Sequence, residues 1–265
     1  MGGESRPAGS GAFGGEILFG MTTQETLKAV LFDLDGLMVD TEPYQFGAFQ
    51  VLLARRGIEL PESAMAGLLG YDEVTNLRQL KPQYDLPETV EELLAERRQI
   101  YLELLARERV APMAGFWEVS GEARRLGLKQ AVVSSSTRAY VEAALAKVFS
   151  ARPELGGFAG YFDAIVCGDE VENTKPAPDL YRLAVERLAV VPEECLALED
   201  SPAGVRSARA AGARCLAVVA RYARPEDFTG AAVFASLHDV LPYLRNSCGE
   251  SDGASGEENT VAKES

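Results

Sequence analysis

The chain has 265 residues, of which 47% are hydrophobic and 25% charged, a composition typical of a soluble globular protein with one or two domains. Its formal net charge of −14 argues against a nucleic-acid or anionic-membrane partner, because both require a basic surface. No apolar run approaches the length of a membrane span. We assign the single histidine, His238, a surface or structural role, which excludes a histidine-based triad and a multi-histidine zinc site.

Both ends of the chain are expected to be disordered. Residues 1–23 are rich in Gly and Ser and lack the basic region and long apolar stretch of a secretory signal; Met21 is a candidate start. Residues 246–265 form an acidic tail of Gly, Ser and Glu with almost nothing to bury. The four cysteines show no metal-type pair spacing, so we expect reduced thiols and a cytoplasmic protein.

The first predicted strand, residues 28–34, ends in the sequence Asp33-Leu34-Asp35-Gly36. Burying unpaired carboxylates is costly, so this pair of acids needs an explanation. One explanation is that the acids lie in a solvent-exposed turn that Gly36 makes possible. A calcium loop is set aside, because Gly36 comes too early and a strand precedes it. A third explanation is a binding site for a cation or a phosphate at the carboxyl end of the strand, where open α/β sheets bind their ligands.

About ninety residues with helical patterns follow this strand, and we interpret residues 41–111 as a helical cap inserted into the core. An insertion at the mouth of a strand-end site is well placed to act as a lid. The expected cap helices are 43–56, 62–69, 72–80 and 87–109.

Strands and helices then alternate, which is typical of a parallel sheet covered on both faces. We therefore predict an α/β protein with a Rossmann-like core formed by residues 24–40 and 112–245. Expected strands are 130–134, 164–167, 195–198, 215–219 and, more weakly, 232–235. Expected helices are 116–126, 139–148, 179–188 and 203–211, with an extended loop at 150–160.

Polar residues follow each of the next three strands. Ser134 and Ser135 open a helix, the loop after the third strand carries Lys175, and the fourth strand leads into Glu199 and Asp200. Each group alone has an ordinary explanation as a helix cap or a surface loop. Because the carboxyl ends of parallel strands meet in one crevice, together they predict a site for a divalent cation and a phosphoryl group.

The segments "FDLDGLMVDTE", "VVSSSTR", "TKPAPDLY" and "LEDSPAGVRSARAAG" resemble, in order, the four motifs of the haloacid dehalogenase superfamily of phosphotransferases. The resemblance spans about residues 28–222 and is closest to β-phosphoglucomutase-like phosphatases with a helical cap. It implies a Mg²⁺-dependent phosphatase acting on a small phosphorylated metabolite, such as a sugar phosphate. It also identifies Asp33 and Asp35 with the two acidic residues of the first motif.

By this resemblance, Asp33 is the nucleophile that forms a phospho-aspartyl intermediate, and Asp35 is the general acid and base. Mg²⁺ would be bound by Asp33, the backbone carbonyl of Asp35, and Asp200, with Glu199 as a ligand or as a partner of the ligands. The phosphoryl oxygens would be held by Ser134, Ser135 and Lys175.

Two alternatives remain: a phosphomutase with the same first half-reaction, and a catalytically silent binding protein on the same fold. The silent alternative requires a missing nucleophile, metal ligand or lysine, and none is missing. For the mutase, Gln45 stands where a histidine is expected, and Asp72 and Glu73 stand where an arginine is expected. Acidic groups there would repel a distal phosphate, so we predict hydrolysis.

The sequence does not identify the substrate or the oligomeric state. Six basic cap residues are possible anion contacts, although each is more typical of a solvated helix face. They are Arg55, Arg56, Arg78, Lys81, Arg97 and Arg98.

Overall fold

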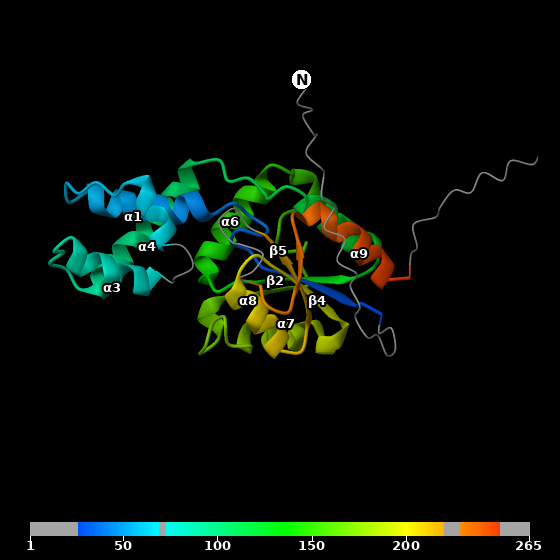
Figure 1. Ribbon diagram of the computed structural model, residues 1–265. Coiled ribbons are helices and arrows are strands. Elements are labelled where there is room, and N and C mark those ends of the chain that lie inside the picture. The colour runs from blue at the N-terminus through cyan, green and yellow to red at the C-terminus, as the bar shows by residue number, and fades with distance from the viewer. Residues whose placement is uncertain (1–25, 69–72, 220–227, 250–265) are drawn as a thin grey trace, which may run out of the picture.

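The computed structural model describes residues 26–68, 73–219 and 228–249 (Figure 1). The disorder expected for residues 1–23 and for most of the acidic tail concerns residues outside these ranges. Asp72, which was expected where the mutases have an arginine, also lies outside them. Among the described residues, no helix is both long enough and apolar enough to cross a membrane. The four cysteines are free thiols, and the side chain of His238 is half exposed at the surface.

The core is a six-stranded parallel sheet in the order β3-β2-β1-β4-β5-β6, which confirms the predicted fold class. β1 lies in the centre, with Phe32 opposite Val132 on one side and Leu198 on the other. This central position buries all four residues of β1 and brings its carboxyl end beside those of β2 and β4. The strands are β1 (Ala29–Phe32), β2 (Lys129–Val133), β3 (Ala164–Val166), β4 (Cys195–Glu199), β5 (Arg214–Val218) and β6 (Ala232–Phe234).

Helices cover both faces of the sheet, because alternate residues of its strands are apolar on each face. Ala29 and Leu31 pack against α7 (Asp179–Leu188) and α8 (Pro202–Ala210), whereas Val30 and Phe32 belong to a second apolar cluster on the other face. Helices of that second cluster are α5 (Phe116–Arg125), α6 (Arg138–Ser150) and α9 (Val240–Ser247). Figure 1 shows α7 and α8 on one side of the sheet and α9 on the other.

The cap consists of α1 (Glu42–Ala54), α2 (Met65–Leu68), α3 (Glu73–Gln83) and α4 (Val90–Arg107). Figure 1 shows α1, α3 and α4 together at one end of the molecule, beside the core. Buried cap residues such as Leu52, Leu93 and Tyr101 share one apolar cluster with the core residues Phe116 and Val141. The cap therefore packs on the core and does not hang free of it.

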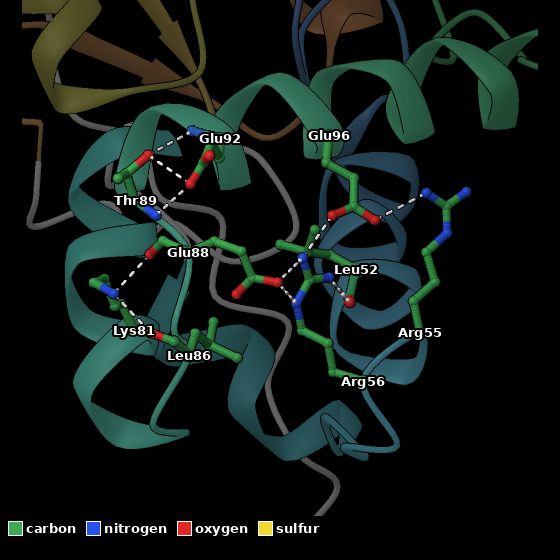
Figure 2. Close-up of polar contacts among 9 residues, drawn as sticks. All are labelled: Leu52, Arg55, Arg56, Lys81, Leu86, Glu88, Thr89, Glu92 and Glu96. Carbon is green, nitrogen blue, oxygen red and sulfur yellow. Dashed lines mark hydrogen bonds and ion pairs between the residues drawn. The ribbon is translucent and has the colours of Figure 1, made fainter.

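Several element boundaries differ from the predicted ones. α4 begins three residues later than expected because Thr89 caps it: the Glu92 N–H donates to Thr89 Oγ1 at 3.2 Å, and the Thr89 N–H donates to Glu92 Oε2 at 2.8 Å (Figure 2). α3 continues past residue 80 to Gln83. α9 was not predicted, and its last two residues, Asn246 and Ser247, had been assigned to the tail.

Candidate active site

Asp33 directly follows β1 and lines a cavity between core and cap. Its N–H donates to the backbone oxygen of Leu198 at 3.1 Å, which continues the pairing of β1 with β4 and fixes the position of the residue. Its side chain is almost fully buried but reaches the cavity wall. The local sheet structure thus explains how a carboxylate comes to lie at the end of a buried strand.

Asp35 lies in the turn that follows, and three hydroxyl groups hold its carboxylate. Thr41 Oγ1 donates to Asp35 Oδ1 at 2.7 Å, while Ser136 Oγ and Ser134 Oγ donate to Oδ2 at 2.8 and 3.1 Å. The turn depends on Gly36, which has φ +85°, and a Cβ at this position would overlap Asp200 Oδ2. The two acids of the first motif therefore have different surroundings.

The loop after β2 places its three serines differently. Ser134 is fully buried; its hydroxyl binds Asp35 and accepts a hydrogen bond from the Ser136 N–H at 3.0 Å. Ser135 and Ser136 line the cavity. The assignment of Ser134 and Ser135 as phosphate-binding residues stays a prediction, with Ser135 the one of the two that lines the cavity.

Lys175 lies in the loop between β3 and α7, with its side chain 6% exposed. Its ammonium group donates to Asp33 Oδ1 and, at 2.8 Å, to the backbone oxygen of Val133. It also forms an ion pair with Glu199 at 2.6 Å and lies 5.3 Å from the ring centroid of Tyr181. Lys175 therefore lies directly beside Asp33, and its role in holding the phosphoryl oxygens stays a prediction.

Glu199 and Asp200 follow β4 and complete a group of carboxylates. Oxygen atoms of Asp33, Glu199 and Asp200 all lie within 4.8 Å of one another, a spacing at which one cation can be shared. Glu199 is fully buried; Tyr181 donates to its Oε1 at 2.5 Å and Ser201 to its Oε2 at 3.2 Å. The assignment of Asp33, Glu199 and Asp200 as metal ligands stays a prediction, with which this spacing is compatible.

The electrostatics of this group favour an added cation. Burial, opposed by the ammonium group of Lys175 and aided by the charges of Glu199 and Asp35, raises the pKa of Asp33 to about 8. Burial and the charges of Asp33 and Glu199 raise the pKa of Asp200 well above its usual value. Burial lowers the pKa of Lys175, but the charges of Asp33 and Glu199 outweigh it, so its pKa is raised. One ammonium group faces several buried carboxylates, which suits a hard divalent cation.

The cavity above these residues has a volume of about 440 Å³, enough for a small metabolite. Its core side carries Asp33, Asp35, Lys175 and Asp200. The cap closes the opposite side with residues from α1 through α4. They are Glu42, Gln45, Phe46, Phe49, Met65, Leu68, Glu73, Asn76, Arg97 and Arg98.

Three of the six basic cap residues lie away from the cavity and bind other parts of the cap (Figure 2). Arg56 pairs with Glu88 at 2.8 Å and with Glu96 at 2.6 Å, and Arg55 pairs with Glu96 at 3.0 Å. Lys81 donates to the backbone oxygens of Leu86 and Glu88, in the connection that precedes α4, each at 2.6 Å. The arginine contacts join the end of α1 to α4 and to the α3–α4 connection, and Lys81 joins α3 to that connection. None of the three residues lines the cavity.

The expectation of solvated side chains is wrong for Arg97, which is 1% exposed. Arg97 and Arg98 both line the cavity, whereas Arg78 is exposed on α3. Both arginines bind Glu73. Glu73, which stands where the mutases have an arginine, is thus paired with two cations, and its expected effect on a distal phosphate stays a prediction.

Sequence reasoning missed the residues that orient the acids. Thr41 and Ser136 hold Asp35, and Tyr181 holds Glu199. Each belongs to one of the four motif segments, so the segments themselves were informative. The missing information was which side chains point toward the carboxylates, which depends on the turns after β1 and β2.

Comparisons with known proteins identify similar sequences and structures. A family model described as haloacid dehalogenase-like hydrolase matches residues 30–218. Protein CbbY of Rhodobacter capsulatus is 34% identical over 211 residues, covering 77% of this chain and 91% of that protein. Fructose-1-phosphate phosphatase YqaB of Escherichia coli (strain K12) is 31% identical over 189 residues, covering 71% of this chain and 94% of the relative.

A solved structure has the same fold. It is CbbY from Rhodobacter sphaeroides, a mutant form in complex with xylulose-(1,5)bisphosphate, with a TM-score of 0.71 and 29% sequence identity. The match covers 81% of this chain and 96% of that structure, so both the core and the cap are shared.

Proposed function

The chain belongs to the haloacid dehalogenase-like hydrolase family, and we propose that it is a Mg²⁺-dependent phosphatase that hydrolyses a small phosphomonoester through a phospho-aspartyl intermediate. The observation that carries this proposal is the position of Asp33, a carboxylate between the ammonium group of Lys175 and the carboxylate of Asp200 at the base of a metabolite-sized cavity. Phosphoryl transfer requires alignment and neutralisation of charge, and this arrangement provides groups for both.

In the first step, Asp33 attacks the phosphorus atom. Lys175 binds Oδ1 of Asp33, so we assign the attack to Oδ2. A bond forms between Asp33 and phosphorus, the bond from phosphorus to the ester oxygen breaks, and Asp35 gives its proton to that oxygen. Lys175 stabilises the negative charge on the phosphoryl oxygens, and Ser135, which also lines the cavity, can bind them.

In the second step, water attacks the phospho-aspartyl group. Asp35, now ionised, accepts a proton from the water, the bond between phosphorus and Asp33 breaks, and inorganic phosphate is released. Asp35 returns to its protonated state and Asp33 to its ionised state, so the cycle is balanced.

Asp33, Asp200 and the backbone carbonyl of Asp35 would hold Mg²⁺, with Glu199 supporting them through Lys175. The close carboxylate oxygens and the raised pKa of Asp33 support this assignment, because buried like charges need a cation nearby. When bound, Mg²⁺ would neutralise phosphoryl charge and polarise the phosphorus–oxygen bonds.

We propose a sugar phosphate or a similar metabolite as the substrate. The size and polar lining of the cavity support this class, and relatives are named for fructose 1-phosphate or were crystallised with a sugar bisphosphate. Location in the cytoplasm stays a prediction from the reduced cysteines.

The test is a turnover screen of purified protein across sugar phosphates, nucleotides and p-nitrophenyl phosphate, with release of inorganic phosphate as the readout. We expect activity with Mg²⁺, loss of activity with a chelator, and recovery with Mg²⁺ but not with Ca²⁺, whose larger coordination shell spoils the in-line geometry. Full activity without metal would contradict the proposal.

A second assay separates hydrolysis from mutase activity. The protein is incubated with β-glucose 1-phosphate, Mg²⁺ and a trace of the 1,6-bisphosphate. Formation of glucose 6-phosphate much faster than release of phosphate from any monoester would identify a phosphomutase. We expect hydrolysis, because Gln45 replaces the histidine of the mutases.

A further inference from the structure

The cap end of the cavity is lined by Glu73 from α3 and by Arg97 and Arg98 from α4, together with Gln45 from α1. We infer that this cluster selects a phosphomonoester with a neutral, hydroxylated distal end and disfavours a second phosphate, and that Glu73 is the discriminating residue. This inference rests on the proposed phosphatase function and adds the class of substrate.

Arg97 is a fixed part of the cavity wall. Its Nη1 donates to Glu73 Oε2 at 2.9 Å, and its Nη2 donates to the backbone oxygen of Gln45 at 3.0 Å and to Gln45 Oε1. The guanidinium carbon lies 4.6 Å from the ring centroid of Phe49. Both terminal nitrogens of this buried cation therefore already have acceptors within the cap.

Arg98 uses the same carboxylate. Its Nε donates to Glu73 Oε1 at 2.7 Å, and its Nη2 binds the same oxygen. Glu73 thus divides its two oxygens between the two arginines, with Oε2 toward Arg97 and Oε1 toward Arg98. An acidic side chain occupies the place that an anionic group of a ligand would otherwise take.

A second phosphate at this end would compete with Glu73. To bind the guanidinium groups it must displace the carboxylate from buried Arg97, or lie beside that carboxylate at close range. The first outcome breaks a buried ion pair, and the second places like charges together. Discrimination by a repulsive group is a common means of specificity.

A hydroxyl group at this end of the cavity neither breaks the ion pair between Glu73 and Arg97 nor places a second negative charge beside Glu73. It can donate to a remaining lone pair of Glu73 and accept from Gln45, and so join the cluster without disrupting it. Because Oε1 of Gln45 accepts from Arg97, the amide nitrogen is the end of Gln45 that can donate to a ligand oxygen. A sugar monophosphate has such hydroxyl groups at the end remote from its phosphate.

The first test compares kcat/KM of the full chain with Mg²⁺ for fructose 1-phosphate, glucose 6-phosphate, fructose 1,6-bisphosphate and p-nitrophenyl phosphate. We expect kcat/KM for the better of the two sugar monophosphates to exceed kcat/KM for the bisphosphate by about tenfold or more, the ratio that 1.4 kcal/mol produces. A preference for the bisphosphate would overturn the inference while hydrolysis of p-nitrophenyl phosphate upholds the phosphatase function. Failure to hydrolyse any of the four overturns both.

The second test uses Glu73→Gln, which keeps the shape of the side chain and removes its charge. We expect the ratio of bisphosphate to monophosphate kcat/KM to rise by about tenfold, because the arginines become available to a second phosphate. Glu91→Gln, an exposed residue in the first turn of α4, is the matched control and should leave the ratio unchanged. An unchanged ratio in a folded Glu73→Gln protein overturns the inference; if that variant does not fold, the wild-type ratio decides.

Discussion

Lys175 donates a hydrogen bond from its ammonium group to Asp33, although the two residues lie 142 positions apart in the chain. The same group pairs with Glu199 and binds the last residue of β2, so one cation connects the carboxyl ends of β1, β2 and β4. It cannot neutralise every carboxylate around it.

Asp33→Asn should reduce phosphatase turnover by at least about 10³-fold, because an amide oxygen is a poor nucleophile and loss of an essential nucleophile commonly has an effect of this size or larger. The amide has nearly the same shape, so the circular dichroism spectrum should not change. Asp239→Asn, an exposed position near α9, is the matched control and should retain wild-type turnover. Wild-type turnover in a verified, undeamidated Asp33→Asn sample would falsify the assignment.

The stability of the metal-free protein should fall as pH rises from 6 to 8. The pKa of Asp33 is raised from 3.8 to about 8 in the folded state, so between these values the folded protein keeps a proton that the unfolded chain has released. The unfolded state is therefore favoured with rising pH, by at most about 1.4 kcal/mol per pH unit for one proton. Thermal melts at pH 6, 7 and 8 measure this slope.

Mg²⁺ should reverse that trend, because its ligands must be ionised and a cation offsets their repulsion. The rise in Tm on addition of Mg²⁺ should accordingly be larger at pH 8 than at pH 6. Asp33→Asn, which has no proton to lose, should reduce the slope of the metal-free protein and leave the part that belongs to Asp200, whose pKa is also raised. A metal-free protein whose stability increases over this range would contradict the account of Asp33.

Gly36→Ala should lower both stability and Mg²⁺ affinity. Gly36 has φ +85°, where an L-residue costs roughly 1–2 kcal/mol, and the added Cβ would overlap Asp200. Gly121→Ala is the matched control: Gly121 lies within α5 with nothing in reach of a Cβ, so alanine should stabilise the helix slightly. Thermal melts and titration calorimetry with Mg²⁺ check both variants.

The sheet was predictable from the sequence because each of its strands contains a short apolar run bounded by turns or helices. α7 was predicted with its observed bounds, since its apolar stripe is regular and the strands on either side are clear. α9 was not predicted: it is short and contains a proline, and the strongest signal near it was the disordered-looking tail. Sequence patterns therefore identify regular helices such as α7 better than short helices near a terminus such as α9.

The site was predictable to the level of which residues converge, because strand ends in a parallel sheet share one edge. Partners across the cavity were not predictable. The spacing on α4 does not reveal that Arg97 is buried on Glu73 while its neighbour Arg98 is half exposed. Such contacts depend on how the cap packs against itself, and the sequence carries no direct signal of that packing.

Thr41→Val should slow the hydrolysis of esters with poor leaving groups. Thr41 is fully buried, and its hydroxyl donates to Asp35 at 2.7 Å, so the isosteric change removes one of three donors that orient the proposed general acid. We expect kcat for a sugar phosphate to fall by about 10-fold to 100-fold, within the contribution of general acid catalysis. p-Nitrophenyl phosphate should be affected much less, because its leaving group departs without protonation. Thr41→Ser, which keeps the hydroxyl, should restore most of the activity toward the sugar phosphate. An equal loss for both esters, together with no rescue by serine, would show that Thr41 supports the fold and does not position Asp35.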